Sequence, residues 1–248
     1  MESYETILLA AAGLAAGIVN TMAGGGSMLT VPALVVLVGL PGTVANGTNR
    51  LGVLLMNAAA VWQFRREGLS GIRTALPLLP PVAAGSLVGA LAIARVDDGT
   101  FERLFGLVML ALVVPTLRPP KPRSDTTRPH GRAARFALFF AIGLFGGAFQ
   151  AGVGILLVLA LAHAGTDLVR ANSAKVAITF AFTLFSFPVF VAEDQVRWIP
   201  GLIVGAGFAA GGALGARLAV AGGERVIRPV MVAAVLALAA RMTGVYGG

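Results

Sequence analysis

The chain has 248 residues, of which 57% are hydrophobic and only 12% are charged, and its mean hydropathy is +0.86. This composition excludes an ordinary soluble domain and predicts a polytopic membrane protein. The net charge of +8 is interpreted as a topology signal and not as a nucleic-acid-binding surface. With no cysteine and two histidines, we expect no disulfide, no thiolate chemistry, no multi-histidine metal site and no cofactor.

Apolar segments predict helices at residues 4–22, 27–40, 44–64, 74–95, 101–117, 134–150, 153–165, 171–192, 199–216 and 227–246. A membrane span needs about 20 apolar residues, so 27–40 and 153–165 are too short to cross comfortably. Each of them follows its predecessor after a short turn that contains glycine. We interpret 4–40 and 134–165 as helical hairpins bent near the bilayer midplane. Whether they cross fully or re-enter is left open.

The same pattern occurs twice in the chain. Residues 17–50 align without a gap on 143–176, and the pair Ala45-Asn46 falls on Ala171-Asn172. A duplicated membrane unit with interrupted helices in corresponding positions is typical of transporters and indicates where the substrate binds. We therefore predict an all-α protein of two repeats, each with a glycine-hinged hairpin and three transmembrane helices.

The predicted organisation is a first repeat at 1–117, a basic linker at 118–133 and a second repeat at 134–248. Three crossings and one hairpin per repeat give an odd displacement, which predicts that the second repeat is inverted. With the N-terminus outside, thirteen cations fall in the cytoplasm and four outside, namely Arg95, Arg103, Arg197 and Arg241. The positive-inside rule thus predicts both termini outside the inner membrane and a cytoplasmic linker.

Two runs of spaced glycines predict close helix packing. They are Gly85-xxx-Gly89 and Gly207-xxx-Gly211-xxx-Gly215. In lipid, helices associate by van der Waals contact, and small residues allow their backbones to approach. We interpret both runs as packing faces without a chemical role.

Two of the nineteen cations, Arg50 and Lys175, are set inside apolar segments. Such a residue is costly in a membrane and by default marks a ligand site or pathway. The alternative is that both side chains snorkel to the interface. Donors beside a cation are the chemistry of an oxyanion site. The neighbouring candidates are Asn46, Thr48 and Asn49 for the first cation, and Asn172 and Ser173 for the second.

The two hairpin bends predict further anion-binding groups. A helix that starts at a bend exposes unpaired N–H groups and the positive end of its dipole. Glycine permits unusual backbone angles and close approach, although a glycine run can also be only a packing hinge. The candidates are Gly24, Gly25, Gly26 and Ser27 in the first bend, Gln150, Gly152 and Gly154 in the second, and, more weakly, Asn20 and Thr21.

The first repeat contains Asn20-Thr21-Met22-Ala23-Gly24-Gly25-Gly26-Ser27, then Val31-Pro32, Gly39-Leu40-Pro41 and Ala45-Asn46-Gly47-Thr48-Asn49. With these motifs the chain resembles the TauE/SafE family of sulfite and organosulfonate exporters. The resemblance covers essentially the whole chain and implies secondary transport of a small sulfur oxyanion. The second repeat departs from the family pattern, with Lys175 at a usually small polar position.

These observations together predict an inner-membrane secondary transporter that exports sulfite, thiosulfate or an organosulfonate. An anion channel with the same pore-lining residues is the alternative, and no catalytic residue is predicted because no nucleophile with a base is visible. All eleven carboxylates lie at segment ends or in loops, so no proton relay is evident. The expected partners are the oxyanion and the lipid bilayer, without nucleic acid. The exact substrate, transport direction, coupling ion and oligomeric state, a homodimer included, are left open.

Overall fold

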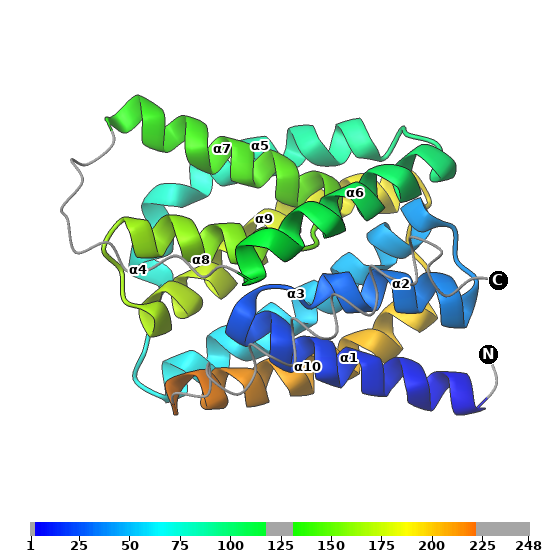
Figure 1. The fold of residues 1–248 in the computed structure, drawn as a ribbon. Coiled ribbons are helices and arrows are strands. Elements are labelled where there is room, and N and C mark those ends of the chain that lie inside the picture. The colour runs from blue at the N-terminus through cyan, green and yellow to red at the C-terminus, as the bar shows by residue number, and fades with distance from the viewer. Residues whose placement is uncertain (1–2, 118–130, 222–248) are drawn as a thin grey trace.

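The computed structural model describes residues 3–117 and 131–221, and the described part is built of helices and their connections (Figure 1). The elements are α1 (Ser3–Ala23), α2 (Ser27–Val38), α3 (Gly42–Arg66), α4 (Ile72–Ala75), η1 (Leu76–Leu78), α5 (Leu79–Ile93), α6 (Asp98–Leu117), α7 (Arg132–Phe149), α8 (Val153–His163), α9 (Leu168–Ala192) and α10 (Trp198–Val220). The all-α prediction is confirmed. The segment expected at 227–246 and most of the linker lie outside the described residues.

Five helical stretches of the described part are long and apolar enough to cross a membrane. They are Ser3–Met22, Ile72–Ile93, Arg132–Phe149, Leu168–Ala192 and Trp198–Val220. Helix α3 has 25 residues, a length of about 37 Å at 1.5 Å per residue. It is less apolar because it buries a polar run inside the protein, from Asn46 to Arg50. The chain is therefore a multi-pass membrane protein.

Two short helices complete the predicted hairpins. α2 has 12 residues and α8 has 11, and each follows its longer partner, α1 or α7, after a tight bend. We call α1–α2 hairpin 1 and α7–α8 hairpin 2. α2 is capped at its C-terminus by Gly39, whose φ of +70° lets the chain turn while its N–H bonds to the carbonyl of Val35.

The glycine faces pack the hairpins against other helices. α1 lies along α10, and α7 lies along α5 (Figure 1). A Cβ on Gly211 would overlap the carbonyl oxygen of Leu14 in α1, and one on Gly89 would overlap that of Leu144 in α7. The predicted packing role is confirmed. In both cases the first helix of a hairpin packs on a helix from the other repeat.

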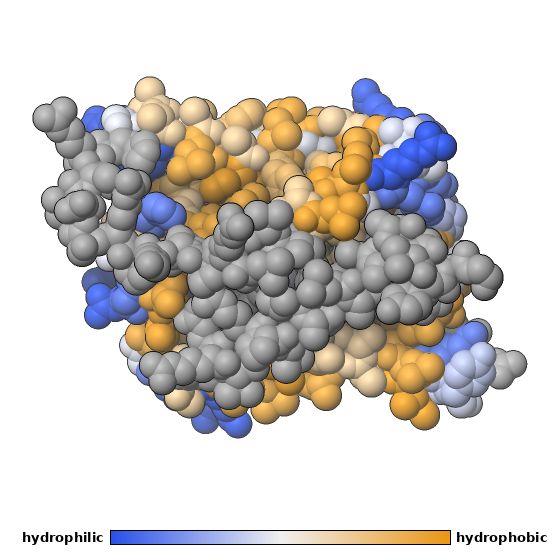
Figure 2. Space-filling view, in the orientation of Figure 1, coloured by the Kyte–Doolittle hydropathy of each residue, from blue (hydrophilic) through white to orange (hydrophobic). Residues whose placement is uncertain are grey.

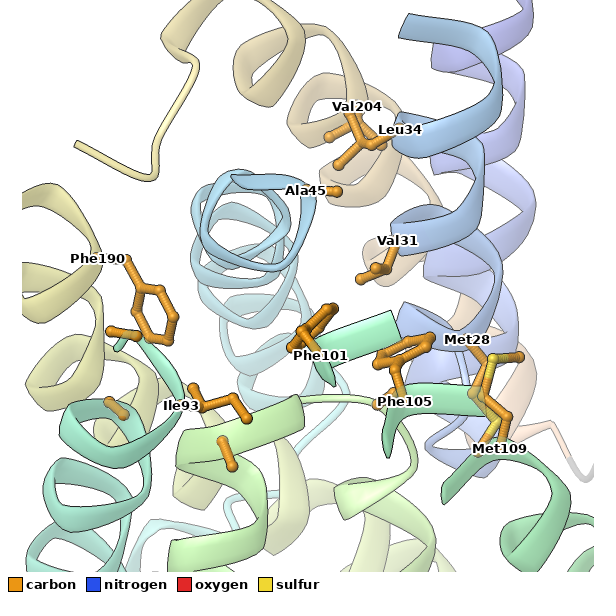
Figure 3. Packing of buried hydrophobic residues seen from close by; sticks show 14 of the residues in the cluster. Met28, Val31, Leu34, Ala45, Ile93, Phe101, Phe105, Met109, Phe190 and Val204 are labelled. Carbon is orange, nitrogen blue, oxygen red and sulfur yellow. The ribbon is translucent and has the colours of Figure 1, made fainter. Parts of the chain in front are cut away.

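An apolar core lies between hairpin 1 and the helices that face it. Figure 3 shows Phe101 and Phe105 of α6 beside Met28 and Val31 of α2, with Phe190 of α9 on the opposite side. At the surface, Figure 2 shows hydrophobic residues between the two ends of the visible face, above and below the grey atoms, and hydrophilic residues at the left and right ends. This distribution is the one expected of a bundle whose middle faces lipid.

Candidate functional site

The first bend is built from glycines. Gly24 has a φ of +91°, a left-handed value that disfavours a side chain. Its backbone touches hairpin 2, because a Cβ on Gly154 would lie only 2.5 Å from the Gly24 Cα. The N–H of Gly26 is bound by the side-chain Oδ1 of Asn20 at 3.0 Å. Helix α2 then starts at Ser27, so its N-terminus lies among buried residues.

The second bend contains a side chain where the first has a glycine. Gln150 aligns with Gly24 and has a φ of +60°, followed by Gly152 at +72°. Both the oxygen and the nitrogen of the Gln150 amide are engaged. Its Oε1 accepts a hydrogen bond from Nη1 of Arg50 at 2.9 Å, and its Nε2 donates to the Thr183 hydroxyl at 3.2 Å. The second bend is therefore closed by its own side chain.

Arg50 is fully buried and binds the end of hairpin 2's first helix. Its Nη1 and Nη2 groups donate hydrogen bonds to the carbonyls of residues 146–148, the last turn of α7. Nη1 also donates to the Ser186 hydroxyl at 3.1 Å. The guanidinium lies 4.1 Å from the centre of the Phe190 ring, a cation–π distance.

Lys175 makes the corresponding contact with hairpin 1. Its side chain is 1% exposed, and its Nζ donates to the carbonyls of Asn20 at 2.7 Å and Thr21 at 2.6 Å. A third hydrogen bond of 2.9 Å goes to Oδ1 of Asn172. Because both cations are buried and bound to protein acceptors, neither snorkels to the interface, and that alternative was wrong.

The hydroxyl groups of the two polar runs bind loops. Oγ1 of Thr48 accepts a hydrogen bond from the N–H of Arg197 at 2.9 Å. Oγ of Ser173 accepts one from the N–H of Gly71 at 2.8 Å. Both loops belong to the repeat other than that of the hydroxyl. These predicted site residues are thus engaged in joining the two repeats.

Several buried polar atoms near hairpin 1 have no partner. Asn49 is 0% exposed, and its Oδ1 accepts a hydrogen bond from the Thr30 hydroxyl in α2. Its Nδ2, the Nε of Arg50 and the Oγ1 of Thr21 are buried without a hydrogen bond within the described part of the chain. All three can donate, and a buried donor without an acceptor is costly. Donors of this kind are the groups that bind oxyanions in proteins.

The charge of the two cations is not balanced by acidic residues among those described. No carboxylate in 3–117 or 131–221 is buried. The two ion pairs seen there are on the surface, Arg170 with Asp167 at 3.3 Å and Arg197 with Asp194 at 3.5 Å. The described residues also contain no cluster of histidine, aspartate and glutamate that could hold a metal ion.

A continuous set of contacts joins most of the predicted residues. The structure brings together Gly24, Gly26, Ser27, Gly154, Asn20, Thr21, Asn46, Asn49, Arg50, Gln150, Asn172 and Lys175, directly or through the last turns of α1 and α7. Gly25 and Gly152 lie in the bends themselves. Asn46 donates to the carbonyl of Ala148 at 2.8 Å.

Sequence reasoning missed four residues of this region, Thr30, Thr183, Ser186 and Phe190. A signal for three of them exists on α9. Thr183, Ser186 and Phe190 follow one another at three to four residues in an apolar segment, which places them on one face of a helix. Nothing comparable marks Thr30.

Comparison with known proteins gives a family and several relatives. The model of the family described as sulfite exporter TauE/SafE matches residues 9–242. The chain is 29% identical over 232 residues to probable membrane transporter protein ORF9 of a Sinorhizobium species, covering 92% of this chain and 88% of that one. It is 29% identical over 238 residues to a probable membrane transporter protein of Haemophilus influenzae, with coverages of 95% and 93%.

A third relative is the probable membrane transporter protein YfcA of Escherichia coli K12. It is 24% identical over 230 residues, and the alignment covers 92% of this chain and 85% of that one. No solved structure matches the chain at a significant level. The relatives therefore indicate membrane transport without naming a substrate.

Proposed function

Because the chain belongs to the sulfite exporter TauE/SafE family of membrane transporters, we propose that it is a secondary transporter that exports a small sulfur-containing oxyanion across the inner membrane. Sulfite, thiosulfate and organosulfonates are the candidate substrates. The observation that carries the proposal is the presence of two buried cations, Arg50 and Lys175, without a buried carboxylate in the described residues.

Charge balance supports an anionic substrate. An uncompensated charge inside a membrane protein is costly, and helix carbonyls supply only partial negative charge to offset it. A bound oxyanion would supply the missing full charge. It would also accept hydrogen bonds from the donors that now lack acceptors, Nδ2 of Asn49 and Nε of Arg50.

In this proposal the anion binds at the first bend. The N-terminus of α2 provides the positive end of its dipole. The N–H groups of Gly24 and Gly26 are already bound to Asn20, so in this proposal the backbone donors to the anion come from Gly25 and Ser27. Asn49 and the Nε of Arg50 provide side-chain donors, and the Thr21 hydroxyl adds a third. The second bend, Gln150 to Gly154, is the inverted counterpart on the same pathway. Lys175 contributes positive potential from the end of α1.

The proposal includes two inverted repeats with both termini outside and residues 118–133 in the cytoplasm. It is supported by the cation sorting of the sequence and by the pairing of each hairpin with the other repeat. Reporter fusions after Gly248 and within the linker test it directly. A cytoplasmic C-terminus would mean parallel repeats and would contradict this part of the proposal.

The membrane potential is a sufficient driving force for export. No buried carboxylate is available as a proton relay in the described segments. An anion that leaves a cytoplasm with negative potential gains about 2.3 kcal/mol per charge per 100 mV. The substrate can also carry the proton itself. Alternating access by rocking of the two repeats is the expected mechanism.

The proposal is tested with purified protein and with proteoliposomes. Thermal shifts with sulfite, thiosulfate, sulfate, sulfoacetate and taurine identify which anions bind, because a ligand that binds only the folded state raises its stability. Flux of the best ligand is then followed under imposed potentials and pH gradients. Movement against the anion's electrochemical gradient would exclude the channel alternative. Absence of both binding and flux for all five compounds would contradict the proposed substrate class.

A further inference from the structure

We propose that Arg50 and Lys175 are reciprocal positioning residues, each holding the carbonyl end of the interrupted hairpin in the other repeat. Arg50 binds the last turn of α7, and Lys175 binds the last turn of α1. The inference rests on the proposed function for the identity of the transported ion. The contacts themselves do not depend on it.

The two cations bind equivalent places. The last carbonyls of a helix have no partner within the helix and form the negative end of its dipole. Both hairpins present such an end among buried residues. At each end one carbonyl also accepts a local N–H, that of Asn20 from Gly24 and that of Gly146 from Gln150, and the cation adds a second donor. Lys175 binds the carbonyls of Asn20 and Thr21, and Arg50 binds those of Gly146 and Gly147, which the repeat alignment places opposite them.

Lys175 has no hydrogen-bonding capacity left for a ligand. An ammonium group has three donors, and its three acceptors are the carbonyls of Asn20 and Thr21 and the Oδ1 of Asn172. An anion could contact Lys175 only by displacing one of them. In Arg50, both terminal nitrogens are engaged, and the Nε alone lacks a partner. Positioning therefore accounts for nearly all donors of both cations.

A second pair of contacts also joins each repeat to the other. In each repeat a hydroxyl precedes the cation by two residues, Thr48 before Arg50 and Ser173 before Lys175. Each hydroxyl accepts a hydrogen bond from a loop N–H of the other repeat. Figure 1 shows α3 and α9, which carry these residues, in the interior of the bundle between the α1–α10 pair and the α5–α7 pair.

This arrangement predicts a crossed effect. A change in the second repeat at Lys175 loosens hairpin 1, and a change in the first repeat at Arg50 loosens hairpin 2. A residue that served only as an anion ligand would produce no such crossing in the absence of anion. Simple loss of stability would loosen both hairpins together.

The absence of cysteine from the sequence makes the test direct. Single cysteines report on each hairpin, Met22→Cys at the end of α1 and Ala151→Cys in the second bend, both at buried positions. Maleimide labelling is measured on purified protein without added anion. Lys175→Gln is expected to accelerate labelling of Met22→Cys about ten-fold or more, the change in local opening expected when a hydrogen bond to a charged group is lost. The same Lys175→Gln substitution is expected to change the labelling rate of Ala151→Cys by about two-fold or less.

Arg50→Gln is expected to give the reverse pattern, with fast labelling at Ala151→Cys and little change at Met22→Cys. The matched control is Arg170→Gln, which neutralises an exposed cation on the same helix as Lys175. It is expected to change neither labelling rate, because an exposed ion pair contributes little.

A third reporter, Val82→Cys in α5, is buried against α7 of hairpin 2. It identifies unfolding beyond hairpin 1 in the Lys175 variants, and Met22→Cys identifies unfolding beyond hairpin 2 in the Arg50 variants. If a glutamine variant labels fast at all three sites, the milder Lys175→Arg and Arg50→Lys variants decide, and the crossed pattern is expected in them at smaller amplitude. Equal acceleration of both hairpin reporters in the mild variants, or acceleration only within the mutated repeat, would overturn the inference. A crossed pattern in a protein that neither binds nor moves sulfur oxyanions would instead overturn the proposed function alone.

Discussion

Hairpin 1 and hairpin 2 break their helices at equivalent positions but stabilise the break differently. In hairpin 1, Gly24 adopts the left-handed conformation, and the amide N–H two residues later is bound by Asn20 from the same hairpin. In hairpin 2, Gln150 adopts a positive φ and its amide bonds to Arg50 and Thr183, which lie on other helices. The side chain that binds the first bend's amide thus comes from the same hairpin, whereas Gln150 ties the second bend to other helices. The helix-end carbonyls of both breaks are bound by a cation from another helix.

The difference bears on where an anion would bind. The side chain of Gln150 fills the second bend and saturates the terminal nitrogens of Arg50 together with the α7 carbonyls. The first bend has no side chain at the corresponding position, and Asn49 beside it keeps an unpaired buried donor. The two bends are therefore unequal: the second is filled by a side chain, and the first lies beside a buried donor without a partner.

The largest expected effect is on stability, from removing the cap of hairpin 2. Arg50→Met deletes five hydrogen bonds and is expected to cost about 3–5 kcal/mol, because several hydrogen bonds to a charged group are lost and buried helix-end carbonyls are left without that donor. Lys175→Met deletes three and is expected to cost about 2–3 kcal/mol. Denaturation of the purified protein without anion measures both. The reverse order would show that hairpin 1 depends more on its cap than hairpin 2 does.

Gly24→Ala is expected to have the next largest effect. The methyl group meets both a positive φ and the backbone of Gly154, for a combined cost of about 2–4 kcal/mol. Gly165→Ala is the matched control, since Gly165 has a φ of +85° but nothing within 4 Å of an added Cβ. Gly165→Ala introduces only the backbone strain of a positive φ, which is expected to lower the free energy of unfolding by about 1 kcal/mol. Equal losses of unfolding free energy in the two variants would mean that the backbones of the two bends can move apart to accommodate the methyl group at little cost.

Gln150→Ala tests how far the second bend depends on its amide. Loss of two buried hydrogen bonds, one of them to a cation, is expected to cost about 1–2 kcal/mol. Thr183→Val removes one of the two and is expected to cost about 1 kcal/mol or less. Melting temperatures of both variants decide the order. A neutral Gln150→Ala would show that the bend is fixed by its backbone.

The smallest expected effect on stability comes from Asn49→Leu, which removes an unpaired donor and leaves Thr30 its contact with the carbonyl of Gly26. Its expected effect on binding is larger, a loss of about 1 kcal/mol of the sulfite-induced stabilisation. Thermal shift with and without sulfite measures both quantities. An unchanged sulfite shift would place the anion away from the first bend.

Much of the fold could be predicted from the sequence because its signals are local. The apolar segments predicted α3 at 44–64 and α9 at 171–192, and the structure has Gly42–Arg66 and Leu168–Ala192. Length predicted the two short helices, and the spaced glycines predicted packing faces. These features follow from residue type and spacing alone, so no knowledge of neighbours was needed.

The candidate site was predicted in its membership and less well in its roles. Arg50 and Lys175 stood out because a cation in an apolar segment is rare, and both are buried beside the bends. The hydroxyls of Thr48 and Ser173 were expected to face substrate, and the structure engages them with loop N–H groups instead. That the candidate residues together bind an anion stays a prediction.

The sequence by itself determined that this is a helical membrane protein with two broken hairpins and two cations set in apolar segments, because hydropathy, glycine spacing and charge depend on residue types alone. The tertiary structure alone decided what the cations bind. Their principal acceptors are backbone carbonyls at the ends of helices about a hundred or more residues away. Every residue has a carbonyl, so no residue type marks these acceptors, and only the packing of each hairpin beside the other repeat reveals them.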